Sequence, residues 1–168
     1  MTLSSSAAQK KVLVIAFILL ALDQFTKFWA VLTLENRPRI SLIPALIGDG
    51  GPWVSLTVTR NTGAAFSFGS NFTFIFSALA IFVIGLIVYL SRNFTNKYWI
   101  ITLGLMMGGA AGNLSDRVFR APANFQGGVV DFIAVEKFAV FNVADIAITL
   151  AAIGIFLLTL FKVDEKAK

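Results

Sequence analysis

The stretch FTFIFSALAIFVIGLIVYL, residues 72–90, decides the fold because it contains no charged side chain. The uncharged interval around it extends from Arg60 to Arg92. A helix of roughly 20 apolar residues is long enough to cross the hydrocarbon core of a bilayer. The sequence therefore predicts a membrane-spanning helix over residues 72–90.

More apolar segments lie on either side of this stretch. No charge lies between Lys97 and Asp116, and only Asp145 interrupts the interval between Lys137 and Lys162. Together with the N-terminal apolar run, these intervals predict spanning helices over residues 12–33, 98–114 and 138–161. We therefore expect an all-α membrane protein with four transmembrane helices in one membrane-embedded domain, residues 1–168.

The start of the first span resembles the apolar core of a signal peptide, because it follows two lysines at positions 10 and 11. Asp23, Lys27 and Trp29 continue the segment where small residues would mark a cleavage site. We therefore expect this helix to be retained.

Composition excludes several kinds of chemistry. Charged residues make up 14% of the 168 residues, whereas globular proteins carry about 25%. The chain has no cysteine and no histidine, so a Ser-His-Asp triad, a thiol nucleophile and a Cys- or His-ligated zinc site are impossible. We expect neither a metal nor a cofactor. The net charge of +5 arises at the ends of the spans, so we expect membrane lipid and no nucleic acid as a partner.

The distribution of lysine and arginine predicts the orientation. These residues are denser in the N-terminal tail, the 91–97 link and the C-terminal segment than in the two long inserts, residues 34–71 and 117–137. Positive residues favour the cytoplasmic side. We therefore expect both termini in the cytoplasm and both inserts outside. Within the first insert, apolar and polar residues alternate over 54–59, which predicts a strand.

Glycines recur at four-residue spacing in the third span, at Gly104, Gly108 and Gly112. Such spacing lets another helix approach closely. From the sequence, the partner is either another helix of this chain or a second copy.

Two aspartates are the best catalytic candidates, since ionisable groups near a bilayer core are functional-site hypotheses by default. Asp145 interrupts the fourth span, and Asp131 precedes that span in a small apolar cluster. Alternatively, Asp145 pairs with a cation as a clamp between helices, and Asp131 is a solvated loop residue. Two neighbouring carboxylates share a proton, so that one activates water while the other polarises a carbonyl.

Other polar residues fall at helical spacing around these two. Asn142 lies three positions before Asp145, and Asn113 lies four before Arg117, so each pair shares a helix face. Arg117 either joins the site, reaches lipid phosphate or pairs with Asp116. Asp23 and Lys27 have the spacing of a helical ion pair, for which a structural role is favoured. Asn61 lies in a segment typical of a turn.

Several functions remain compatible with these residues alone. One is an aspartic hydrolase built on the two aspartates. A small transporter or proton-coupled carrier would use Asp23, Asp145 and Arg117 as a relay, although the chain shows no internal repeat. A magnesium-dependent lipid transferase would need clustered carboxylates, and a scaffold protein would use the polar groups to join helices.

Five segments, in order, resemble the motifs of bacterial lipoprotein signal peptidase, also called signal peptidase II. They span most of the chain, and the match rests on their order as well as their residues. They are Asp23–Lys27, Arg60–Phe66, Gly108–Arg117, Val129–Phe132 and Phe141–Asp145. The stretch 118–130 is longer than in the enterobacterial pattern and the stretch 131–142 is shorter, which affects the expected shape of the outer lid.

The resemblance implies an aspartic endopeptidase with Asp131 and Asp145 as its catalytic dyad. It places the supporting or substrate-binding residues at Asp23, Asn61, Asn113, Arg117 and Asn142. The implied substrate is a diacylglyceryl-modified prolipoprotein, cut before its lipidated cysteine, and the implied inhibitor is the cyclic peptide globomycin. The expected location is the bacterial cytoplasmic membrane, with the site near the outer face and a small extracytoplasmic β-cradle in the first insert.

Overall fold

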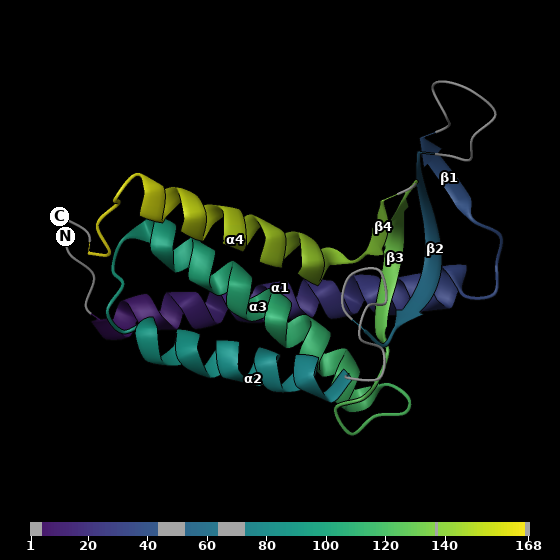
Figure 1. Cartoon of the computed structure of the whole chain (residues 1–168), viewed down its shortest axis with the longest axis horizontal. Coiled ribbons are helices and arrows are strands. Elements are labelled where there is room, and N and C mark those ends of the chain that lie inside the picture. Colours follow the sequence, from purple (N-terminus) through teal and green to yellow (C-terminus); the bar gives the residue numbers. More distant parts are fainter. Residues whose placement is uncertain (1–4, 44–52, 64–72, 137, 167–168) are drawn as a thin grey trace.

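A bundle of helices carries a small sheet at one end (Figure 1). The computed structural model describes residues 5–43, 53–63, 73–136 and 138–166. Within them the helices are α1 (Ser5–Leu34), α2 (Thr73–Leu90), α3 (Lys97–Phe119) and α4 (Val143–Leu160). The strands are β1 (Ile40–Ile43), β2 (Val54–Asn61), β3 (Val129–Val135) and β4 (Ala139–Phe141). Helix α1 begins and α4 ends at the end of the bundle opposite the sheet.

Three of the described helices are long and apolar enough to cross a membrane, over Ser6–Leu34, Thr73–Leu90 and Val143–Leu160. Large apolar side chains such as Phe17, Phe82 and Phe156 are mostly exposed on them, as suits helices that face lipid. Helix α3 forms where the third span is predicted, but it is not among these three. Its sequence is rich in glycine, and it packs against α1, α2 and α4.

The glycines at four-residue spacing in α3, Gly104, Gly108 and Gly112, form a ridge that packs against α1 of the same chain. A methyl group at Gly108 would lie 2.8 Å from the carbonyl oxygen of Ala16, and one at Gly104 would lie 2.6 Å from the Ile15 side chain. A Cβ at Gly112 would lie 2.5 Å from a carboxylate oxygen of Asp23. Of the two partners compatible with the sequence, the structure therefore places a helix of this chain on the ridge.

The predicted start of the fourth span is wrong. Residues 139–141 form β4, and helix α4 begins at Val143 with Asn142 as its N-cap. The Asn142 side chain accepts a hydrogen bond from the backbone N–H of Asp145, and the Asp145 carboxylate accepts one from the backbone N–H of Asn142. This capping box ends the strand and starts the helix. Periodicity alone does not distinguish a short apolar strand from the first turn of a helix.

Other predicted boundaries also shift. Helix α3 continues to Phe119, so the predicted insert 117–137 begins inside a helix. Helix α1 includes Leu34, which was assigned to the first insert. The predicted first residue of the second span, 72, and residues 64–66 of the second motif lie outside the described residues.

The sheet takes strands from both inserts, whereas the sequence placed the whole cradle in the first. Its order is β1-β2-β3-β4, and every neighbouring pair is antiparallel. The strand predicted over 54–59 is confirmed as part of β2. Phe132 of β3 packs with Ala30 and Leu34 of α1, which fixes the sheet to the end of the bundle. This contact brings strand residues close to the ends of α3 and α4.

Candidate active site

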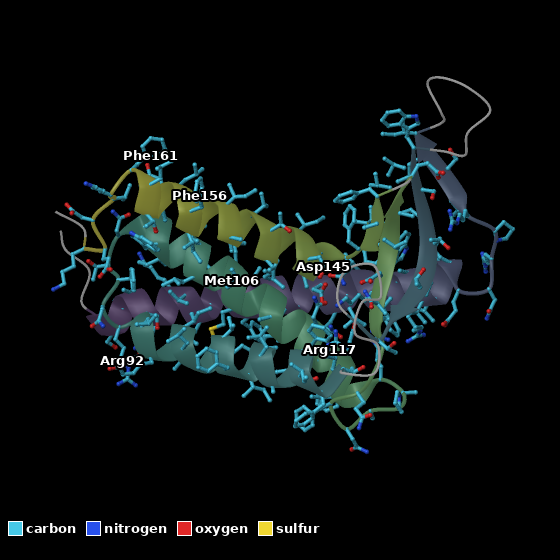
Figure 2. The ribbon with its side chains drawn as sticks, viewed as in Figure 1. Arg92, Met106, Arg117, Asp145, Phe156 and Phe161 are labelled. Carbon is cyan, nitrogen blue, oxygen red and sulfur yellow. The ribbon has the colours of Figure 1, made fainter. Side chains whose placement is uncertain are left out.

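The predicted site residues gather where the bundle meets the sheet. Asp131 lies within β3 opposite Thr59 of β2, so it is a strand residue and not a loop residue. Asp145 lies in the first turn of α4. Figure 2 shows Asp145 and Arg117 at the sheet end of the helices, and Arg92 and Phe161 at the opposite end.

Asn142 binds both aspartates. Its side-chain Nδ2 donates to Asp131 Oδ1 at 2.6 Å, and its backbone N–H donates to Asp145 Oδ2 at 3.1 Å. Asn142 is fully buried and Asp131 is 2% exposed. The sequence predicted that Asn142 and Asp145 share a helix face. In the structure Asn142 is instead the N-cap of α4, and Asp145 is the third residue of that helix. One residue therefore links the two carboxylates.

The orientation of two amides follows from backbone donors. The backbone N–H of Gly63 donates to Asn61 Oδ1 at 3.0 Å, so the NH₂ group of Asn61 faces Asp131 Oδ2 at 3.1 Å. The backbone N–H of Asp145 donates to Asn142 Oδ1 at 3.0 Å, so the NH₂ group of Asn142 faces Asp131. A backbone N–H only donates, which identifies each amide oxygen without reference to the carboxylates. Asp131 therefore accepts one amide N–H on each oxygen.

Asn113 supplies the corresponding donor to Asp145. Its Nδ2 lies 2.8 Å from Asp145 Oδ1, and its Oδ1 accepts from Lys27 Nζ at 2.9 Å and from Asn142 Nδ2 at 3.2 Å. The Asp145 carboxylate is thus bound by an amide and by the backbone N–H of Asn142 at the N-terminus of a helix. Among the described residues, the donors to the Asp145 carboxylate are neutral amides, so these contacts differ from the expected clamp with a cation.

Arg117 is buried beside this group. Its Nη2 donates to the carbonyl oxygen of Gly63 at 2.8 Å, and its guanidinium carbon lies 5.6 Å from the centre of the Phe76 ring. Among the described residues, its buried Nη1 has no hydrogen-bond partner. Within the described ranges no salt bridge joins Arg117 to Asp116, so that expected alternative is wrong; Asp116 pairs instead with Arg120 at 2.6 Å and Lys27 at 3.0 Å. Buried polar groups are normally hydrogen-bonded, so this donor is available to an acceptor on a molecule that enters the site.

Both aspartates line one cavity of about 530 Å³, to which Asn61, Asn113 and Arg117 also contribute. Its apolar wall comes from the first turns of α4 and from β4, with the side chains Val140, Phe141, Ile146, Ile148 and Leu150. A second cavity of about 470 Å³ shares Asn61 and Asp131 with the first and carries Arg39 and Glu136. Asp131 therefore stands between an apolar cavity and a more polar one.

The pKa of Asp131 is raised from its ordinary 3.8 to about 6. Burial is the largest cause and the negative charge of Asp145 adds to it, while the hydrogen bonds from Asn61 and Asn142 and the charge of Lys27 act in the opposite direction. A carboxyl group with this pKa exchanges a proton near neutral pH, as general acid–base catalysis requires. In the described ranges, no group of three or more His, Cys, Asp or Glu side chains is placed to share a metal ion.

Two of the predicted site residues, Asn142 and Asp23, do not line the cavity. Asp23 is fully buried, and its Oδ1 accepts the backbone N–H of Ala144 at 2.9 Å while its Oδ2 pairs with Lys27 at 2.9 Å. The sequence identified the Asp23–Lys27 pair from its spacing. It gave no sign that Lys27 also pairs with Asp116, at 3.0 Å, or reaches Asn113.

Known proteins with similar sequences share most of the chain. A family profile described as signal peptidase (SPase) II matches residues 15–161. The lipoprotein signal peptidase of Streptomyces coelicolor is 45% identical over 150 residues, which cover 89% of this chain and 70% of the relative. That of Rhodococcus jostii is 42% identical over 151 residues, which cover 90% of this chain and 73% of the relative.

Known structures agree with this match. A solved structure described as a bacterial membrane enzyme superposes with a TM-score of 0.70 at 28% identity, and covers 94% of this chain and 92% of that one. The sequence and the fold thus point to the same group of proteins. The chain belongs to the signal peptidase II family of lipoprotein signal peptidases, and is a membrane-embedded peptidase.

Proposed function

We propose that Asp131 and Asp145 form the catalytic dyad that hydrolyses the peptide bond before the lipidated cysteine of diacylglyceryl-modified prolipoproteins. One observation carries this proposal: Asn142 binds both carboxylates, and both line the same cavity. Relatives named lipoprotein signal peptidases supply the substrate class.

In the proposed reaction, Asp131 holds the shared proton and Asp145 is ionised. The pKa of Asp131, raised to about 6, supports this division. Asp145 takes a proton from water as the water oxygen attacks the scissile carbonyl, while Asp131 gives its proton to the carbonyl oxygen. When the tetrahedral intermediate collapses, Asp145 gives its proton to the leaving nitrogen, and a hydroxyl of the intermediate returns one to Asp131.

Neighbouring donors would hold the substrate. Arg117 lines the cavity, and its buried Nη1 has no acceptor among the described residues, so we assign it to a carbonyl oxygen of the bound substrate. Asn61 and Asn113 line the same cavity and keep the two carboxylates in place. We assign Asn142 to orienting the dyad and Asp23 to supporting the helix that carries Asp145.

The two cavities divide the substrate by polarity. The acyl chains would lie along the apolar wall of α4, where Ile146 and Leu150 line the larger cavity. The peptide would extend toward Arg39 and Glu136 in the more polar one. A globomycin-type cyclic peptide would inhibit by filling the cavity beside the dyad.

We further propose that all four helices span the bacterial cytoplasmic membrane as one domain, with both termini in the cytoplasm. Lys and Arg are denser near the start of α1 and the end of α4, and both of these ends lie opposite the sheet (Figure 1). Because positive residues favour the cytoplasmic side, this distribution supports the orientation. The dyad then lies near the extracytoplasmic face. A reporter at residue 95 should be cytoplasmic and one at residue 124 extracytoplasmic, and the reverse would overturn the orientation.

Product analysis tests the proposed reaction. Purified protein in detergent is incubated with a precursor that carries a diacylglyceryl-cysteine, and the product masses are measured. We expect a mature fragment that begins at the lipidated cysteine, in equal yield with and without a chelator. The same precursor without its lipid is the control and should be cut poorly. Loss of activity on chelation, restored by magnesium, would instead support the alternative of a magnesium-dependent enzyme.

A further inference from the structure

We infer that Lys27 is a positioning residue for the reaction: its ammonium group sets the Asn113 amide that binds Asp145, and joins two carboxylates that hold the backbone next to each catalytic aspartate. This inference rests on the proposed dyad. Lys27 does not line either cavity beside the dyad, so it would act entirely through other residues.

Lys27 uses all three of its N–H donors inside the protein. The side chain is fully buried, and Nζ lies 2.9 Å from Asp23 Oδ2, 3.0 Å from Asp116 Oδ2 and 2.9 Å from Asn113 Oδ1. An ammonium group has three donors and no acceptor. Three acceptors from α1 and α3 therefore fix the position of the charge.

The contact with Asn113 determines which end of that amide faces the dyad. Because an ammonium group only donates, the atom next to Lys27 must be the amide oxygen. The NH₂ group then points to Asp145 Oδ1 at 2.8 Å. A rotated amide would place its oxygen against the Asp145 carboxylate and its NH₂ group against Lys27, so both contacts would become repulsive. Removing Lys27 removes this restriction and leaves Asn113 Oδ1 with only the longer contact from Asn142 Nδ2, at 3.2 Å, among the described residues.

The two carboxylates beside Lys27 each hold the backbone one residue before a catalytic aspartate. Asp23 Oδ1 accepts the N–H of Ala144 at 2.9 Å, and Asp116 Oδ2 accepts the N–H of Val130 at 2.9 Å. Ala144 precedes Asp145 on α4, and Val130 precedes Asp131 on β3. Lys27 therefore joins the supports of two elements that are far apart in the sequence, and so helps to set the distance between the two carboxyl groups.

The charges of this cluster balance. Arg120 binds Asp116 Oδ1 at 2.6 Å, so two basic and two acidic side chains occupy the cluster. Buried charges are tolerated when they are paired and hydrogen-bonded, whereas removing one partner is strongly destabilising. Variants at Lys27 therefore need a control that separates lost folding from lost positioning.

Gln24 provides that control. Its Nε2 donates to Asp23 Oδ2 at 3.2 Å, to Asp116 Oδ1 at 3.3 Å and to the carbonyl oxygen of Gly112 at 3.0 Å, and within the described part of the chain it makes no hydrogen bond with the Asn113 side chain. We expect Lys27→Met to lower kcat by about 100-fold, as small misplacements of reacting groups do, with a much smaller change in KM. Gln24→Met should keep kcat close to that of the unaltered protein. Thermal melts of both variants report whether they fold.

A double-mutant cycle tests whether Lys27 acts through Asn113. If it does, the kcat of Lys27→Met/Asn113→Leu should be close to that of the slower single variant, since the second change removes an interaction already lost. Fully additive losses would overturn the inference, and so would a folded Lys27→Met variant with unaltered kcat.

Three further variants keep the test decisive. If Lys27→Met does not fold, Lys27→Gln/Asp23→Asn preserves the net charge of the cluster, and it should fold with a kcat far below that of Asp23→Asn alone. Equal kcat values would overturn the inference. Asp145→Asn in the same assay is the inactive reference. If it cuts normally, the proposed dyad is wrong; if it is inactive while Lys27 variants cut normally, only the positioning role is wrong.

Discussion

Asn142 binds Asp131 through its side chain and Asp145 through its backbone, and it also begins helix α4. A change at this residue therefore alters two carboxylates and a helix terminus together. Its oxygen is held by the Asp145 N–H, so rotation of the amide would cost both this bond and the bond to Asp131. The position of the two carboxylates thus depends on the same bonds that end the strand and start the helix.

The raised pKa of Asp131 predicts a pH dependence of stability. Between its ordinary pKa of 3.8 and about 6, the folded protein retains a proton that the unfolded chain has lost. Stability should therefore fall as the pH rises through this window, and stay lower above it. At about 1.4 kcal/mol per pKa unit, the contribution is on the order of 3 kcal/mol.

Thermal melts in detergent from pH 3.5 to 7.5 measure this effect. Other groups titrate over the same range, so the comparison is with Asp131→Asn, which lacks only the Asp131 proton. The difference in stability between the variant and the unaltered protein should shift in favour of the variant as the pH rises from about 4 to 6. Parallel curves for the two proteins would contradict the raised pKa.

At the residue scale, the sequence predicted which residues gather at the site but not the contacts that hold them there. Asp131, Asp145, Asn61, Asn113 and Arg117 line one cavity, as their motifs indicated, and their roles stay predictions. Local spacing gave no access to contacts such as Lys27 to Asn113, which joins residues 86 positions apart. Such contacts depend on how the helices pack, which the pattern of one segment does not contain.

Helix α3 owes its place in the bundle to glycine. At Gly108 the nearest atoms to an added methyl group belong to the α1 backbone at Ala16 and to Leu19, so the α1 helix itself would have to move. Gly85 of α2 differs, because a methyl group there would meet nothing within 4 Å. The same substitution should therefore affect stability differently at these two positions.

We expect Gly108→Ala to destabilise the protein by about 1–3 kcal/mol through overpacking. Gly85→Ala should leave it unchanged or stabilise it by up to about 1 kcal/mol, since alanine favours helix. Melting temperatures of the two variants in one detergent provide the measurement. Equal melting temperatures would show that the α1–α3 contact does not depend on this glycine.

At the element scale, the long apolar segments were predictable and their ends were not. Apolar runs predicted helices at α1, α2, α3 and α4, because burial in lipid requires long uncharged stretches. The strand β4 was missed because three apolar residues next to an apolar helix carry no periodicity of their own. The sequence assigned the whole sheet to one insert. The pairing of β2 with β3 joins residues from both inserts, and the pattern of either insert alone does not reveal it.

At the scale of the whole molecule, the site lies where two kinds of structure meet. The helices supply Asp145, Asn113 and Arg117, and the sheet supplies Asp131 and Asn61. Exposed apolar side chains cover the outer faces of the helices, whereas the polar cavity with Arg39 and Glu136 adjoins the sheet. In the proposed function, the lipid chains and the peptide of the substrate would occupy these two environments on either side of Asp131.

The central claim is that the two aspartates act together as the dyad. Asp131→Asn and Asp145→Asn are compared with the unaltered protein for cleavage of a purified lipidated precursor, and their melting temperatures establish that each variant is folded. The account predicts that each substitution alone lowers cleavage by about 10³-fold or more, because each removes a group that transfers a proton in the reaction. A folded variant of either aspartate that cuts the precursor at a rate near that of the unaltered protein would contradict it.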